Sequence, residues 1–165
     1  MTLITSVRRP LTRRSVPARL SSLKEDEFEG YASLFGVADG GGDVVLPGAF
    51  ATSLRRRPAE KIRMLYQHSA SEPLGVWVDI KEDARGLKVR GRLVLDVVRA
   101  REVRALFAEG ALNGLSIGFR TIRARKDPGT GHRLLSEIEL WEISVVTFPL
   151  LAGSLVTAVG ASYGS

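Results

Sequence analysis

Short segments in which apolar and polar residues alternate dominate the chain, and this pattern is typical of half-buried β-strands. The first such segment is FEGYASLF, which begins at Phe28. Three short candidates follow, rich in β-branched and aromatic residues and separated by Pro, Gly or acidic turn segments: IRMLYQH, LGVWVDI and GLKVRGRLVL. Two longer candidates, LNGLSIGFRTIRA and HRLLSEIELWEISVVTF, are joined by the turn-forming DPGTG. The pattern therefore predicts a fold rich in strands.

Two segments favour helices. Between residues 97 and 109 the apolar period changes to that of a helix, with Asp96 available as N-cap and Gly110 as the terminating residue. The stretch DVVLPGAFATSLRR also predicts a short helix, with Pro47 near its first turn. The glycines at 40–42 precede it and predict a flexible loop.

A chain of 165 residues, of which 44% are hydrophobic, is long enough for one compact domain with its own core. We expect this domain to cover residues 28–150. Residues 1–27 form a predicted basic, disordered N-terminal tail. Residues 151–165 are small and rich in Gly and Ser, so we expect them to be loosely ordered.

The net charge of +6 comes from the first 24 residues, which hold six basic residues and no acid. The remainder is charge-balanced, and aromatic residues make up only 7% of the chain, so a folded nucleic-acid-binding face is not expected. A basic nucleic-acid-binding protein remains an alternative, supported only by the arginines of this N-terminal segment. A transit peptide has a similar composition, but Pro10 and Pro17 interrupt any helix there and favour a tail.

Several classes of protein are excluded by what the sequence lacks. No apolar run approaches the roughly 20 residues of a membrane-spanning helix, so no membrane partner is expected. Cysteine is absent, which removes disulfides, thiolate nucleophiles and thiolate metal sites. We expect neither a metal nor a cofactor.

The segment GLSIGF holds a candidate nucleophile, Ser116. On a strand, Gly114, Ser116 and Gly118 share one face while larger apolar side chains occupy the other. The hydroxyl then stands in a trough that a substrate backbone can approach closely, so both glycines are candidate substrate-binding residues. The alternative is an ordinary strand whose small residues accommodate a packed helix. The spacing does not match a nucleophile elbow.

A general base and an orienting acid have few candidates. His68 ends a predicted strand beside the loop SASEPLG, and histidine titrates near neutral pH, which suits a base. A surface or capping histidine is the alternative. Of the three glutamates in SEIELWEISVV, Glu142 lies deepest in the apolar run, and a buried carboxylate requires a partner such as histidine. Glu139, and His132 in the DPGTGH turn, are the fallbacks.

Five segments in this order resemble the tailed-phage prohead proteases: EGYASLFG, GDVVLPGAF, YQHSASEPLG, GALNGLSIGFR and ELWEISVVTFP. That family is similar to the herpesvirus assemblins. The resemblance implies an α+β fold, a small, mainly antiparallel β-barrel flanked by helices. It implies Ser116 as nucleophile and His68 as base. Assemblins have a second histidine as the third member, whereas Glu142 falls on the corresponding element here.

The implied function is a serine endopeptidase of prohead maturation. By resemblance, it cleaves scaffolding protein, or the scaffold-like N-terminal segment of the major capsid protein, and itself. It does so inside the assembling prohead in the host bacterial cytoplasm, and the resemblance leaves a homodimer open. The competing interpretation is a catalytically inactive module of the same fold that binds capsid or scaffold.

Overall fold

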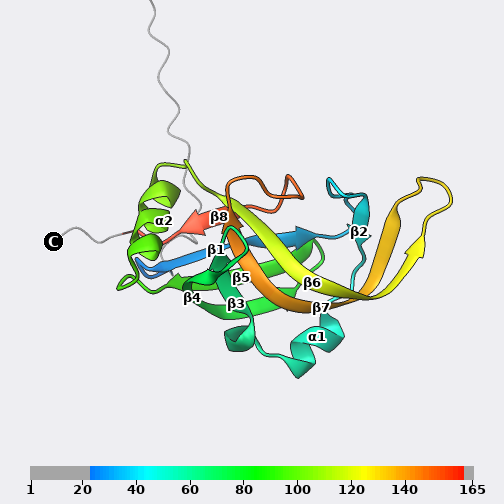
Figure 1. Cartoon of the computed structure of the whole chain (residues 1–165), viewed down its shortest axis with the longest axis horizontal. Coiled ribbons are helices and arrows are strands. Elements are labelled where there is room, and N and C mark those ends of the chain that lie inside the picture. Colours follow the sequence, from blue (N-terminus) through cyan, green and yellow to red (C-terminus); the bar gives the residue numbers. More distant parts are fainter. Residues whose placement is uncertain (1–22, 162–165) are drawn as a thin grey trace, which may run out of the picture.

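The computed structural model describes residues 23–161, and these residues form a single curled sheet flanked by helices (Figure 1). The predicted N-terminal tail lies mostly outside the described residues, as do residues 162–165. The elements of the described part, in chain order, are β1 (Glu27–Leu34), β2 (Asp43–Val45), α1 (Ala51–Arg56), the 3-10 turn η2 (Ala59–Lys61), β3 (Arg63–Tyr66), β4 (Ser69–Glu82), β5 (Gly86–Leu93), α2 (Val98–Ala108), β6 (Gly114–Lys126), β7 (Arg133–Val146) and β8 (Val156–Val159).

The strands follow the order β2-β7-β3-β4-β5-β1-β8, with β6 on the other side of β7. β7 runs parallel to β2 and β3, and the other neighbouring pairs are antiparallel. The two ends of the sheet meet where Gly114 bridges Leu155 and where the Leu115 amide donates to the Ser154 carbonyl at 2.8 Å. The sheet therefore curls into a barrel-like shape, and the predicted fold class is confirmed.

The core lies inside this curl and is centred on Phe28. Its ring packs edge-on against Trp77 at 5.5 Å and against Phe107 at 5.1 Å, which ties β1 to β4 and to α2. Each such aromatic pair contributes about 0.5–1.5 kcal/mol beyond the burial of its surface. Other large side chains that are fully buried include Phe50, Ile62, Met64, Leu74, Leu87, Leu115, Leu135, Ile138, Leu140 and Ile143.

The helix predicted at residues 97–109 is confirmed as α2, which ends at Ala108 and is followed at Gly110 by a positive φ of 68°. Its N-cap is Val97 rather than Asp96. The helix predicted over residues 43–56 was wrong in its first half, because the β-branched, buried Val44 and Val45 pair with β7 as β2. Neither helix described in residues 23–161 is long and apolar enough to cross a membrane.

Two other segments are more ordered than the sequence predicts. The expected loop SASEPLG is the first half of β4, because the β3–β4 connection is a turn of only two residues. Within the segment expected to be loosely ordered, Val156–Val159 forms β8 along the free edge of β1. The pairing extends to the Gly160 amide, which donates to the Glu27 carbonyl at 2.9 Å.

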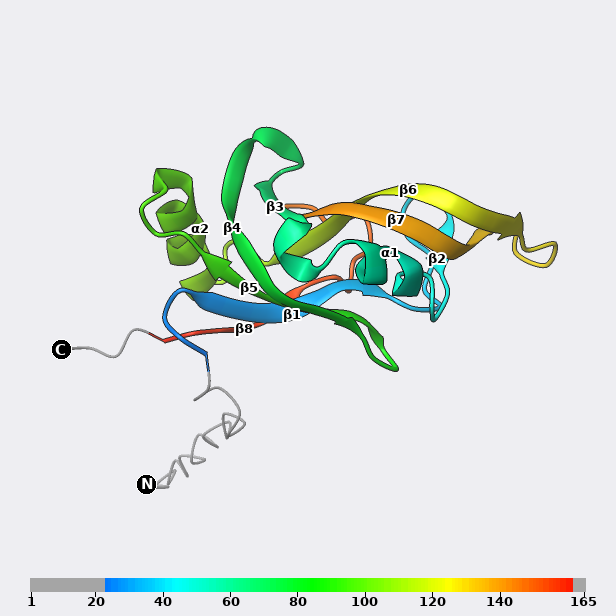
Figure 2. The same cartoon turned by 90° about the horizontal axis from the view of Figure 1, so that it is seen from below.

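The β6–β7 hairpin is long, and its tip projects beyond the body of the protein (Figure 2). Its base lies beside β3, where β7 is the central strand between β6 and β3. The ends of these three strands place the candidate residues on one side of the sheet.

Candidate active site

His68 lies in the turn between β3 and β4, and the backbone of this turn is unusual. Gln67 has a φ of 52° and His68 a φ of 59°. Two consecutive residues with positive φ match a type I′ hairpin, which usually contains Asn and Gly. For other residues this left-handed conformation costs about 1–2 kcal/mol each, so neighbouring contacts have to hold it.

These contacts come from the end of β7. The Gln67 amide donates to the Val145 carbonyl at 2.9 Å, and its side-chain amide donates to the Thr147 hydroxyl at 2.7 Å. The His68 amide donates to the Ser144 hydroxyl at 3.0 Å. The turn that carries the histidine is thus fastened to the strand that carries the predicted acid.

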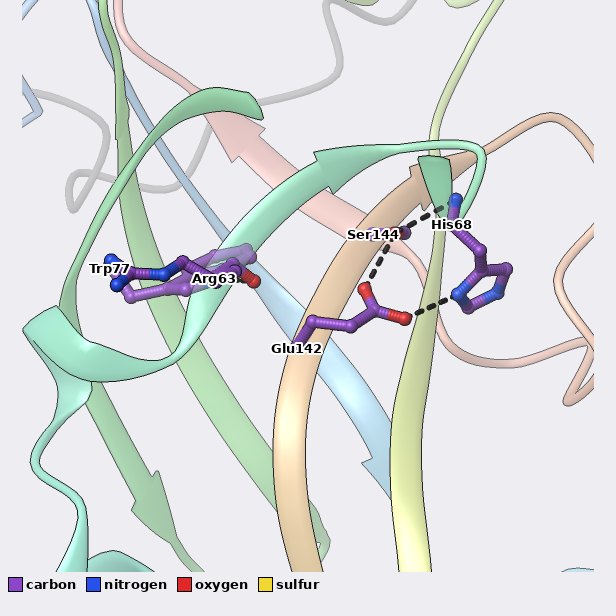
Figure 3. Close-up of polar contacts among 5 residues, drawn as sticks. All are labelled: Arg63, His68, Trp77, Glu142 and Ser144. Carbon is purple, nitrogen blue, oxygen red and sulfur yellow. Dashed lines mark hydrogen bonds and ion pairs between the residues drawn. The ribbon is translucent and has the colours of Figure 1, made fainter. Parts of the chain in front are cut away.

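The imidazole of His68 and the carboxylate of Glu142 contact each other directly. Nδ1 of His68 lies 2.5 Å from Oε1 of Glu142, and Oε2 of Glu142 accepts a hydrogen bond from the Ser144 hydroxyl at 2.6 Å (Figure 3). The Glu142 side chain is only 14% exposed, whereas that of His68 is 45% exposed. A carboxylate acts only as acceptor, so Nδ1 carries the proton and Nε2 is the basic nitrogen of the neutral ring.

Ser116 lies on the same face of the sheet. In the antiparallel β6–β7 pair, Ser116 is opposite Ser144 and Gly118 is opposite Glu142. Directly opposite residues have Cβ atoms about 4.5–5.5 Å apart. Ser116 is partly exposed, and no hydrogen bond joins its hydroxyl to His68 among the described contacts. Such bonds are often long before substrate binds.

Gly114 and Gly118, on either side of Ser116, are both closely packed against residues of β7. A Cβ on Gly118 would lie 2.2 Å from Oε1 of Glu142, so the carboxylate lies directly over this residue. A Cβ on Gly114 would lie 2.4 Å from the Val146 carbonyl oxygen. The close approach that the sequence predicts at Gly118 is thus already made by Glu142, and the role of both glycines in substrate binding stays a prediction.

The fallback residues lie elsewhere. Glu139 pairs with Arg120 at 2.9 Å and with Arg57 at 3.8 Å, on a more solvated part of the hairpin. His132 lies in the turn between β6 and β7, ten residues before Glu142 in the sequence. Among the three residues considered for the acid, Glu142 is the one in contact with His68.

Ser144, Gln67 and Thr147 are the residues that sequence reasoning missed. A signal for Ser144 was present, because it is a single hydroxyl within the apolar run ISVV and is completely buried. A buried hydroxyl requires hydrogen-bond partners. Gln67 and Thr147 carry no such signal, since their contact depends on how the turn meets β7.

An apolar pocket adjoins Ser116 along the outer edge of β6. Its lining includes Ile117, Phe119, Val37 and Leu150 together with Ser116. Past the Leu115 amide, the described part of the chain forms no strand pair on this edge of β6. Open backbone groups and an apolar pocket therefore lie side by side next to the candidate nucleophile.

Solved structures share this architecture. The capsid assembly protease of bacteriophage T4 superposes with a TM-score of 0.58 at 12% identity, over 73% of this chain and 80% of that one. The KSHV protease, solved with a hexapeptide phosphonate inhibitor, gives a TM-score of 0.51 at 10% identity, over 79% of this chain and 63% of that one. The fold is therefore that of the assemblin-like viral assembly proteases.

The sequence identifies the family within this class. Residues 14–164 match the caudovirus prohead serine proteases, and the chain belongs to that family. It is 38% identical to the prohead protease of Enterobacteria phage HK97 over 128 residues, and 30% identical to that of Escherichia phage T5 over 139 residues. These matches cover 76% and 80% of this chain but 56% and 65% of the two relatives, so the chain spans less than two thirds of either length.

Proposed function

We propose that this chain is a serine endopeptidase that acts inside the assembling prohead, in the cytoplasm of the bacterial host. Its substrates are scaffolding protein, or the scaffold-like N-terminal segment of the major capsid protein, and its own chain. The observation that carries the proposal is the 2.5 Å contact between His68 and Glu142 on the face of the sheet that presents Ser116. Membership in a family of prohead serine proteases supports the reaction type.

The chemistry is acyl transfer. Nε2 of His68 removes the proton from the Ser116 hydroxyl as the serine oxygen attacks the peptide carbonyl carbon. Glu142 holds the imidazole by Nδ1 and stabilises the imidazolium that forms. The imidazolium then gives its proton to the leaving amine. Water, deprotonated by His68, attacks the acyl ester and releases the second product and Ser116.

The substrate binds as an extended strand on the open edge of β6. Main-chain hydrogen bonds to that edge give affinity, and alternate side chains of the added strand point to the same face of the sheet, where pockets select them. The pocket lined by Ile117, Phe119 and Leu150 accepts an apolar side chain next to the bond to be cleaved. Scaffold and capsid segments that are extended before maturation meet this requirement.

A fluorophosphonate probe and a capsid substrate test the proposal together. Wild-type protein and Ser116→Ala are incubated with the probe and, separately, co-expressed with the neighbouring capsid gene. Intact-mass spectrometry is expected to find one adduct, mapped to Ser116, and gels are expected to show a shortened capsid protein. Ser116→Ala is expected to lose both signals with its fold intact.

Ser136→Ala is the matched control, because Ser136 lies on β7 in the outer part of the hairpin and donates only a 3.4 Å bond to the Arg123 carbonyl. It is expected to keep both signals. If Ser116→Ala cleaves capsid protein as the wild type does, the proposal is wrong. If neither protein cleaves but both bind capsid or scaffold, the chain is the inactive binding module instead.

A further inference from the structure

Ser144 lies near the C-terminal end of β7, between the buried residues Ile143 and Val145. It is completely inaccessible to solvent, although its side chain is polar. Its Cα is opposite Ser116 on β6 and is aligned with Leu65 on β3, so it sits between the strand of the nucleophile and the strand that leads to His68. A buried hydroxyl is cut off from bulk solvent, so its hydrogen-bond partners decide its role.

Its partners are the two groups that the proposed reaction requires in fixed positions. The hydroxyl donates its single hydrogen to Oε2 of Glu142 at 2.6 Å and accepts the main-chain N–H of His68 at 3.0 Å. The bond to the carboxylate is charge-assisted and therefore strong. One hydroxyl thus contacts the side chain of the acid and the backbone of the base (Figure 3).

We propose that Ser144 is a positioning residue that sets the His68–Glu142 pair; the inference rests on the proposed function. Its hydroxyl bonds to both members of the pair. The donated bond holds the Glu142 carboxylate with Oε1 toward Nδ1 of His68. The accepted bond holds the left-handed backbone at His68, which sets the direction in which the imidazole leaves the turn.

Loss of the hydroxyl has a specific consequence for the imidazole. Without it, the carboxylate can rotate about its side-chain torsions, and the His68 amide has lost its acceptor. The neutral ring is then no longer confined to the tautomer with hydrogen on Nδ1, and the population with hydrogen on Nε2 rises. That second tautomer cannot accept the serine proton at Nε2.

The test compares Ser144→Ala with wild type by nitrogen NMR of protein labelled in histidine and by cleavage of a capsid-derived peptide. Wild-type His68 is expected to show the signature of the Nδ1–H tautomer, and Ser144→Ala a mixture. Because small displacements of catalytic groups can cost about 100-fold in rate, kcat is expected to fall on the order of 100-fold with KM nearly unchanged. Ser144→Cys places a slightly larger side chain with a weak donor at the same position, so its kcat is expected to lie between the two.

Ser53→Ala is the matched structural control. Ser53 on α1 is also buried, and its hydroxyl accepts a β7 amide, that of Leu140, at 2.8 Å. Its loss is expected to lower the urea midpoint while leaving the His68 tautomer and kcat of the folded protein unchanged. The inference is overturned if Ser144→Ala and Ser144→Cys behave like Ser53→Ala, or if wild-type His68 already carries its hydrogen on Nε2.

The two proposals fail in different ways. If wild-type protein neither cleaves nor takes up the probe, the proposed function is wrong, and the tautomer comparison still decides whether Ser144 sets the histidine–glutamate pair. If wild-type protein cleaves normally but the Ser144 variants keep kcat and tautomer, the protease assignment stands and Ser144 only fills space.

Discussion

Gly118 has no room for a side chain, although it is only partly buried. The group that occupies the space is the Glu142 carboxylate, and it is the movable end of a flexible side chain rather than fixed backbone. Gly75 differs, because a Cβ there would lie 2.1 Å from the Arg92 carbonyl oxygen, which is fixed backbone. A methyl group at 118 can therefore displace the acid without disrupting the sheet, whereas one at 75 cannot avoid the backbone.

We predict that Gly118→Ala folds normally but is a poor enzyme. The added Cβ drives the carboxylate from the imidazole, and a misplaced catalytic group costs about 100-fold in kcat/KM. The free energy of unfolding, measured by urea titration, is expected to change by less than about 1 kcal/mol, since alanine suits a strand better than glycine does.

Gly129→Ala provides the control, because a Cβ there meets only Asp127 at 3.5 Å in the hairpin turn. Its kcat/KM is expected to match wild type. A Gly118→Ala enzyme with wild-type activity would show that Glu142 does not need the position it occupies over β6.

The sequence identifies the three candidate residues but not the groups that hold them. Ser116, His68 and Glu142 stand out because serine between glycines, a scarce histidine and a glutamate in an apolar run are each unusual. Ser144 does not stand out in this way, because its role depends on two hydrogen bonds. One joins it to Glu142, two residues away on the same strand, and the other to His68 in the turn after the neighbouring strand β3. Only the register of β3 against β7 brings those groups together.

The turn between β3 and β4 is the element that the sequence predicts least well. The usual signal for a two-residue hairpin is Asn-Gly or Asp-Gly, and Gln67-His68 does not match it. A loop was therefore expected where β4 begins. The unfavourable backbone persists because Ser144 and Val145 of β7, and Thr147 just after it, hold the turn. Strained backbone of this kind is concentrated at functional sites.

The left-handed turn predicts an order of stability between two substitutions. Gln67→Gly and Gln67→Ala both remove the contact with Thr147, but only alanine retains the steric penalty at a φ of 52°. Gln67→Gly is therefore expected to be more stable than Gln67→Ala by about 1 kcal/mol in urea unfolding. In an ordinary right-handed or extended turn, alanine would be the more stable of the two, because glycine gains more entropy on unfolding. The sign of the difference in unfolding free energy between the two variants therefore tests the left-handed conformation at residue 67.

The whole molecule brings together three parts of the chain that are distant in sequence. His68 follows β3, Ser116 lies on β6, and Glu142 lies on β7. Periodicity predicts most of these strands, and the fold class came from the order of five motifs. Periodicity does not predict that β7 runs parallel to β3 and β2 while β6 pairs with its other edge. Pairing between distant strands depends on the packing of the complete core.

An ion pair far from the candidate active site links two neighbouring strands of the sheet, β1 and β5. Glu27, at the start of β1, is buried and accepts a 2.6 Å bond from the Arg90 guanidinium on β5 and a 3.0 Å bond from the Lys24 amide. Burial alone would raise the pKa of Glu27, but these two donors and the charge of Arg90 together lower it below its ordinary value of 4.5. The native state therefore favours the charged form more than the unfolded chain does.

This shift fixes the sign of an acid effect on stability. A carboxyl group with a lowered native pKa stabilises the fold above its unfolded value and loses that contribution as the pH falls through its native value. Wild-type protein is therefore expected to lose more unfolding free energy than Glu27→Gln as the pH falls below the ordinary pKa of a glutamate. Urea titrations at several pH values measure the difference, with Glu60→Gln as an exposed control that follows wild type. Parallel curves for wild type and Glu27→Gln would mean that the Glu27–Arg90 pair does not stabilise the native state.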